Sequence, residues 1–146
     1  MYVDGTVGGG GHAAALCRRS GGACRLVCFD MDEEAIAEAA GRLEGACRAC
    51  TFVHANMRHL ARELGARGMD PITGLLLDLG VSFHQVDDPG RGFSYRFDAP
   101  LDARMDRRSG RTAADVVNGM SEEALEDIVR MFGEERHARR IARRIV

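Results

Sequence analysis

The chain has 146 residues, a length that suits one domain, and 45% of them are hydrophobic while 29% are charged. That balance supports a packed core and argues against a wholly disordered chain. The formal net charge of −2 gives no global attraction to nucleic acid, so a basic binding site must be local, and no apolar run is long enough to span a membrane.

The first predicted element is a short strand at residues 2–4, which leads into a glycine-dense turn and then into an alanine-rich helix over residues 13–19. Strand, glycine turn and helix in that order are typical of the opening unit of a nucleotide-binding α/β fold. Glycine lets the backbone turn tightly and approach a ligand closely. We therefore interpret the turn as a ligand-binding loop, with a plain strand–helix connector as the alternative. His12, in the first helical turn, either faces the ligand or is an ordinary helix residue.

A second predicted strand, residues 26–29, ends at Asp30, twenty residues after Gly10. An acid at this interval accepts hydrogen bonds from ribose hydroxyls in nucleotide-binding folds. Asp4 and Asp78 also stand at strand ends, and the carboxyl ends of parallel strands meet at one edge of a sheet. Three acids, with no basic residue in the loop, suit the cationic sulfonium of S-adenosylmethionine better than the pyrophosphate of a dinucleotide.

Two more strands are predicted at residues 51–54 and 74–78, each preceded by a helix. Asp32 is predicted to cap the start of the helix before the first of these strands, and Asn56 the start of the helix before the second. The alternation of strands and helices predicts a parallel sheet with helices on both faces. We expect Asp78 to follow a buried central strand, where a carboxylate is costly unless a ligand or donor matches it.

The cysteines give no clear indication of a metal site. They are Cys17, Cys24, Cys28, Cys47 and Cys50. Cys47 and Cys50 form a single CxxC pair, whereas a zinc site usually has a second pair or histidines at matching spacing. We expect structural cysteines, no metal and a reducing, cytoplasmic setting.

Residues 80–111 lack helical or strand periodicity, and loops of that length are usually functional. An arginine beside aromatic residues, such as Arg91 beside Phe93, can stack on an extruded base. We favour the alternative, a loop folded on itself by Asp–Arg pairs with Phe93 and Phe97 buried.

Helical periodicity returns toward the end of the chain. Ser121 is predicted to cap one helix, and residues 134–146 form a second pattern whose arginine face we interpret as solvated. This last pattern has no stop signal, and four strands are fewer than the five or so of a doubly wound sheet. We therefore expect an incomplete chain.

Nearly the whole chain resembles one known family. The matching motifs are Tyr2-Val3-Asp4-Gly5-Thr6, Gly10-Gly11-His12, Phe29-Asp30-Met31-Asp32, Leu76-Leu77-Asp78-Leu79-Gly80-Val81-Ser82, Arg91-Gly92-Phe93-Ser94, Pro100-Leu101-Asp102-Ala103-Arg104-Met105-Asp106, Thr112-Ala113-Ala114-Asp115 and Gly133-Glu134-Glu135-Arg136. They are similar to those of the bacterial methyltransferases that modify the N(4) atom of a cytosine in 16S ribosomal RNA, the RsmH or MraW family. Several of them are specific to this family rather than general to methyltransferases.

The resemblance implies a class I S-adenosylmethionine-dependent methyltransferase fold, a Rossmann-like parallel sheet that is truncated here and followed by the start of a helical insertion domain. The cofactor contacts that it implies are Gly10, Gly11, His12, Asp30, Met57, Asp78 and Gln85. Met57 stands where the family usually has an aromatic residue, and Phe83-His84 where it usually has Ser-Pro. The implied divisions are residues 1–80 for the cofactor domain, 81–111 for a substrate and cofactor loop, and 112–146 for the insertion.

The implied reaction transfers the sulfonium methyl group directly to the exocyclic 4-amino group of a cytosine in the decoding region. It needs in-line placement of nitrogen, methyl and sulfur, and an acceptor that polarises an amino hydrogen. Asp78 is the nearest candidate, but we assign no catalytic base and expect no metal. The implied partner is 16S ribosomal RNA within the small subunit, with no membrane; a homodimer stays open, as does the activity of this chain alone.

Two alternatives remain at this stage. An NAD-dependent oxidoreductase could use the same glycine loop and Asp30. A non-catalytic RNA-binding remnant could bind phosphates through its final arginine-rich helix.

Overall fold

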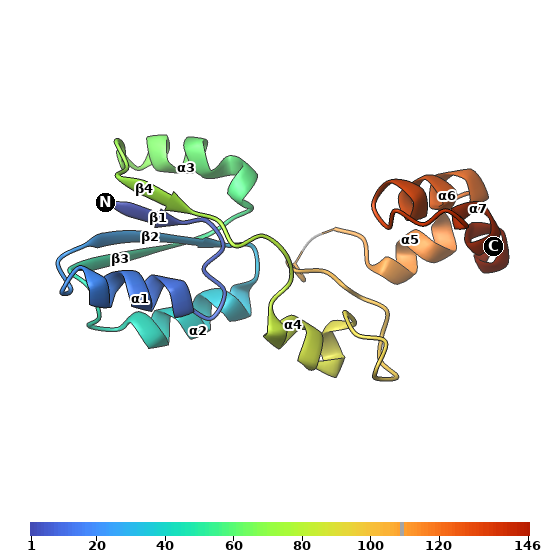
Figure 1. Cartoon of the computed structure of the whole chain (residues 1–146), viewed down its shortest axis with the longest axis horizontal. Coiled ribbons are helices and arrows are strands. Elements are labelled where there is room, and N and C mark those ends of the chain that lie inside the picture. The colour runs from blue at the N-terminus through green and yellow to red at the C-terminus, as the bar shows by residue number, and fades with distance from the viewer. Residues whose placement is uncertain (109) are drawn as a thin grey trace. The chain divides into compact units, whose positions relative to one another are not determined.

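The computed structural model describes residues 1–108 and 110–146, which divide into two units, residues 1–82 and 83–146. The first unit is a four-stranded parallel sheet with helices on both faces (Figure 1). Its strands are β1 (Tyr2–Asp4), β2 (Arg25–Asp30), β3 (Ala49–His54) and β4 (Gly74–Leu76), in the order β3-β2-β1-β4. The predicted α/β class is confirmed. No helix in the described part of the chain is long and apolar enough to cross a membrane.

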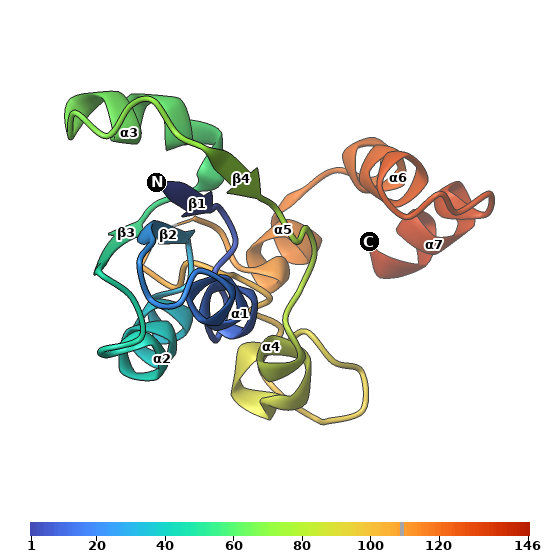
Figure 2. The same cartoon turned by 60° about the vertical axis from the view of Figure 1, so that its left-hand side comes forward.

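Helices cover the two faces of this sheet as separate layers. Helices α1 (Gly11–Arg19) and α2 (Glu33–Leu43) lie on one face, and α3 (Leu60–Ala66) lies on the other (Figures 1 and 2). Successive side chains of a strand point to opposite faces, so Leu26 of β2 packs under α1 and α2 whereas Phe29 packs toward α3. Strands that are buried on both faces read as continuous apolar runs, which is why β2 was recognisable in the sequence.

The predicted caps are confirmed. Asp32 Oδ1 accepts a hydrogen bond from Glu34 N at 3.1 Å and begins α2. Asn56 Oδ1 accepts one from Arg58 N at 3.0 Å and begins a short 3₁₀ turn, η1 (Met57–His59), which continues into α3. Each side chain satisfies a backbone donor that the helix itself leaves unpaired.

The expectation of a buried central strand before Asp78 is wrong. Strand β4 pairs only with β1 among the described strands, so it forms an edge of the sheet and ends at Leu76. Leu75 and Leu77 are therefore 47% and 46% exposed. The side chain of Asp78 is 67% exposed as well.

The second unit begins with two short elements, α4 (Phe83–Asp87) and the 3₁₀ turn η2 (Pro89–Arg91). Arg91 is 1% exposed, and its guanidinium donates to the backbone oxygens of Arg104 and Met105, both at 3.2 Å. Arg104 in turn donates to both carboxylate oxygens of Asp102, at 2.8 and 2.7 Å. The favoured alternative, a loop held by Asp–Arg pairs, is confirmed.

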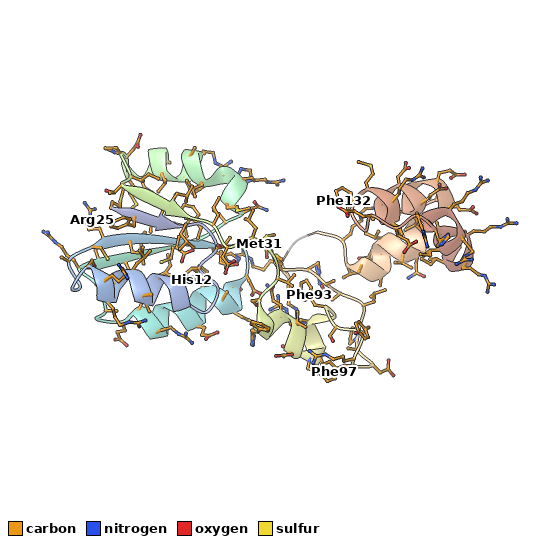
Figure 3. The ribbon with its side chains drawn as sticks, in the orientation of Figure 1. His12, Arg25, Met31, Phe93, Phe97 and Phe132 are labelled. Carbon is orange, nitrogen blue, oxygen red and sulfur yellow. The ribbon has the colours of Figure 1, made fainter. Side chains whose placement is uncertain are left out.

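The two phenylalanines of this loop, Phe93 and Phe97, which Figure 3 labels, are less buried than we predicted. Phe93 is half-buried, but Phe97 is 40% exposed and lies under the guanidinium of Arg96, 5.6 Å from the ring centroid. The prediction that Phe97 is buried is therefore wrong.

Three helices complete the second unit: α5 (Ala113–Gly119), α6 (Glu122–Met131) and α7 (Ala138–Ile145). Ser121 caps α6 as predicted, with Oγ accepting from Ala124 N at 3.3 Å. The final helix starts later than its sequence pattern because Glu134 has a φ of +50°, outside the helical range.

The loop between β1 and α1 generates a stability prediction. Gly8 and Gly10 both have positive φ, but a Cβ at Gly8 would meet nothing within 4 Å, whereas a Cβ at Gly10 would lie 3.2 Å from the Cα of Ala39. We expect Gly8→Ala to lower the free energy of unfolding by about 1–2 kcal/mol, the cost of a left-handed alanine. Gly10→Ala should cost at least about 1 kcal/mol more, because it also pushes against α2. Urea unfolding measures both; equal losses would contradict the close packing of α1 against α2.

Candidate functional site

The glycine loop places the start of α1 at the carboxyl edge of the sheet. After Asp4 the chain turns through Gly10, which adopts the left-handed conformation and donates its N–H to Val7 O at 2.8 Å. No side chain in the described part of the chain caps this helix. The first backbone N–H groups of α1 therefore point out at the positive end of the helix dipole, which favours an anionic group.

Asp30, at the end of β2, holds the glycine loop in place. Its Oδ2 accepts a hydrogen bond from Gly8 N at 2.9 Å, and its Oδ1 accepts one from Asp32 N at 3.0 Å. A third bond, from Val7 N to Phe29 O at 2.8 Å, runs beside them. Asp30 remains half-exposed, so its carboxylate has lone pairs left for a hydroxyl donor.

Asp4, at the end of β1, is fully buried, unlike Asp30 and Asp78. Its Oδ1 accepts from Thr6 N at 3.1 Å, but its Oδ2 has no hydrogen-bond partner among the described residues. Burial raises the pKa of Asp4, and the nearby carboxylates of Asp30 and Asp78 raise it further, against the lowering effects of the Thr6 N–H and of His12. A cation or a donor brought to this edge would relieve that cost.

Asp78 and His12 lie side by side at the same edge, with Nδ1 of His12 3.6 Å from Oδ2 of Asp78. Asp78 N donates to Thr6 Oγ1 at 2.7 Å, so the Thr6 hydroxyl joins the glycine loop to the segment after β4. Thr6 was not among the predicted site residues. The sequence does show a residue with a hydroxyl group two positions after the acid that ends a strand. Such hydroxyl groups often form hydrogen bonds with the backbone of loops.

The segment after β3 is tied to the segment after β2. Ala55 N donates to Asp30 O at 2.9 Å, and His54 Nε2 lies 3.0 Å from Met31 O. Met57 follows at the start of η1 and is 36% exposed. It therefore offers an apolar surface close in the chain to the residues that contact Asp30.

The structure brings six of the seven predicted cofactor residues to one edge. Figure 3 shows His12 and Met31 at this edge of the first unit, where the strands end. The six are Gly10, Gly11, His12, Asp30, Met57 and Asp78. Gln85 belongs to the second unit, in α4, where its side chain is 4% exposed.

The comparisons with known proteins agree with this geometry. A family model described as the MraW methylase family matches residues 1–146. Three curated relatives carry the name ribosomal RNA small subunit methyltransferase H. The protein from Geobacter sp. (strain M21) is 50% identical over 146 residues, that from Geotalea uraniireducens 51% over 146 residues, and that from Sorangium cellulosum 45% over 143 residues.

These matches cover 98–100% of this chain but only 45–47% of each relative. The chain therefore spans about half the length of the curated relatives it matches. Because the family model matches the chain from its first residue to its last, the chain belongs to the MraW methylase family.

Proposed function

We propose that this chain carries the cofactor-binding part of an enzyme that transfers a methyl group from S-adenosylmethionine to the 4-amino group of a cytosine in 16S ribosomal RNA. The observation that carries the proposal is the carboxyl edge of the sheet. It combines an uncapped helix N-terminus with three carboxylates, one of them buried with an oxygen that lacks a partner in the described chain. The family and the names of the relatives support a methyltransferase, and they support neither an NAD-dependent oxidoreductase nor a non-catalytic remnant.

Each part of the cofactor has a chemically matching residue at this edge. The first N–H groups of α1, at Gly11 and His12, suit the carboxylate of the methionine moiety. Asp30 suits the ribose hydroxyls, and Met57 offers an apolar, polarisable surface for the adenine. When bound, S-adenosylmethionine supplies a methyl group on a positively charged sulfur. Asp4 and Asp78 favour that charge electrostatically.

Asp78 is the carboxylate we place nearest to the reacting groups. Its backbone is fixed by the Thr6 hydroxyl, while its side chain is exposed and only 3.6 Å from His12. An exposed carboxylate in this position can accept a hydrogen bond from the amino group of the substrate and so orient that group. We assign no general base, and the cofactor contact that the resemblance implies for Gln85 stays a prediction.

The RNA partner is supported by the relatives' names and by the polar face of α7. A hollow of about 320 Å³ on this helix is lined by Arg136, His137, Arg139, Arg140 and Arg143. None of these arginines forms an ion pair within the described part of the chain. Guanidinium groups left without an acidic partner are suited to bidentate contacts with phosphates. We propose that this face binds ribosomal RNA in the cytoplasm, as part of the small subunit.

Asp30→Asn tests the cofactor site. The substitution keeps one acceptor oxygen but removes the charge and the second acceptor, so S-adenosylmethionine should bind at least about tenfold more weakly, the equivalent of one charge-assisted hydrogen bond. Glu44→Gln removes the same charge from an exposed position at the end of α2 and should leave the affinity unchanged. Calorimetric titration measures the affinity of both variants for S-adenosylmethionine, and circular dichroism checks that both are folded. Equal affinities in the two variants would overturn the assignment of Asp30.

Asp4→Asn removes the charge of this side chain and keeps its size and shape. Because burial raises the pKa of Asp4 in the folded state, the stability that this group contributes is present below the ordinary carboxyl pKa of 3.8 and is lost as the pH rises through the folded value. The variant should therefore be more stable than the original at neutral pH, and the gain should shrink toward acid pH. Its affinity for cationic S-adenosylmethionine should nevertheless fall about tenfold, while that for neutral S-adenosylhomocysteine stays nearly constant. Parallel losses for both ligands would show that Asp4 does not act through its charge.

Arg140→Gln/Arg143→Gln tests the RNA face. Binding to a decoding-region fragment of 16S ribosomal RNA should weaken, and the slope of log affinity against log salt should become shallower by about 0.7–0.9 for each phosphate that the protein no longer neutralises. Arg62→Gln/Arg67→Gln is the matched control, because it removes two arginines that already pair with Glu63 on α3. Fluorescence anisotropy over a salt series measures both. A control that weakens binding equally would contradict a specific role for α7.

A further inference from the structure

Four of the five cysteines gather at the amino-terminal edge of the sheet, opposite the candidate functional site. Cys17 lies in the last turn of α1 and Cys24 directly precedes β2. Cys47 and Cys50 lie on either side of the first residue of β3. Figure 3 labels Arg25, the neighbour of Cys24, at this end of β2, and His12 and Met31 at the other end.

Three of the sulfur atoms are close enough to share one ion: the Sγ atoms of Cys17, Cys47 and Cys50 all lie within 4.8 Å of one another. The Sγ of Cys24 lies outside this group of three but is 3.8 Å from that of Cys17, so rotation of its side chain is needed to bring it in as a fourth ligand. In a tetrahedral zinc site with Zn–S bonds of about 2.3 Å, the sulfurs are separated by about 3.8 Å. The Cys47 and Cys50 sulfurs, at 2.7 Å, would move apart by about 1 Å, which side-chain rotation can supply.

The backbone holds the two cysteine-bearing turns together without help from a metal. Arg48 N, between the cysteines of the CxxC pair, donates to Gly22 O at 2.7 Å, and Gly22 N donates to Cys17 O at 2.9 Å. Gly22 and Gly45 both have positive φ and make the turns possible. The backbone segments that carry the cysteines are thus held together by the fold itself.

We propose that the thiolates of Cys17, Cys24, Cys47 and Cys50 bind one Zn²⁺ ion, which joins the end of α1 and the start of β2 to the start of β3. On binding, four S–H bonds release their protons to solvent and four Zn–S bonds form, with no change in oxidation state. The resulting site carries a charge of −2. Arg25 and Arg48, which are neighbours of the ligands in the chain, carry positive charges that favour such a site.

The donor atoms suit a soft divalent metal, because cysteine sulfurs are preferred ligands of zinc. Cys47 and Cys50 are half-buried, which leaves a route for the ion from solvent.

Metal binding by the reduced, full chain tests the proposal directly. After removal of metal and addition of a reductant, titration with Co²⁺ should saturate at one ion per chain. It should give the intense d–d bands of tetrahedral cobalt together with thiolate-to-cobalt charge-transfer absorption, and Zn²⁺ should displace the cobalt. Cys47→Ser and Cys50→Ser, at half-buried positions, should lose these bands. Cys28→Ala is the matched control, because Cys28 is a buried thiol of the same layer outside the cluster, and it should keep them.

Three results would overturn the proposal. One is a chain that is folded by circular dichroism and fully reduced yet binds neither Co²⁺ nor Zn²⁺. Another is a cobalt spectrum without thiolate charge transfer, or one that Cys47→Ser leaves intact. The third is a Cys47–Cys50 disulfide recovered from cells whose thiols were alkylated at lysis. Titration with S-adenosylmethionine on the same samples is an independent readout, since the two sites lie at opposite edges of the sheet.

Discussion

The carboxylate of Asp30 is the constraint on which the rest of the first unit depends. One oxygen accepts from Gly8 and the other from Asp32, so a single side chain fixes the glycine loop and the entry to α2. The backbone oxygen of the same residue accepts from Ala55 and so fixes the segment after β3. The ends of three strands are thereby held at one edge, and a ligand that binds there meets a surface already formed rather than one that it must organise.

Much of this arrangement was predictable from the sequence. Apolar runs such as residues 26–29 predict strands because a strand buried on both faces has no polar alternation, and Asp32, Asn56 and Ser121 predict helix starts because their side chains can pair with backbone N–H groups. The strand-end acids were identifiable for the same local reason, since each follows an apolar run directly.

The remaining features depend on contacts between distant segments. The hydrophobic periodicity of a strand does not show which strands are its neighbours in the sheet. The sequence therefore could not place β4 at an edge of the described sheet or show that Asp78 is exposed. The spacing of Cys47 and Cys50 alone could not show that Cys17, in the last turn of α1, lies beside them, because only the fold brings these segments together. Thr6 was missed because its partner, the N–H of Asp78, is 72 residues away in the chain.

The exposed edge strand β4 has a consequence for how molecules of this protein behave together in solution. On the side away from β1 this strand has no partner among the described strands, and Leu75 in it and Leu77 just after it are half-exposed, so it can act as a template for a strand of another molecule. Asp70 and Asp78, which flank this strand in the chain, carry negative charges that would repel the same charges on an approaching copy. That repulsion works through water and is screened by ions. Colloidal stability should thus be greatest in dilute buffer, and the high salt often used to keep RNA-binding proteins free of nucleic acid would favour edge-to-edge association.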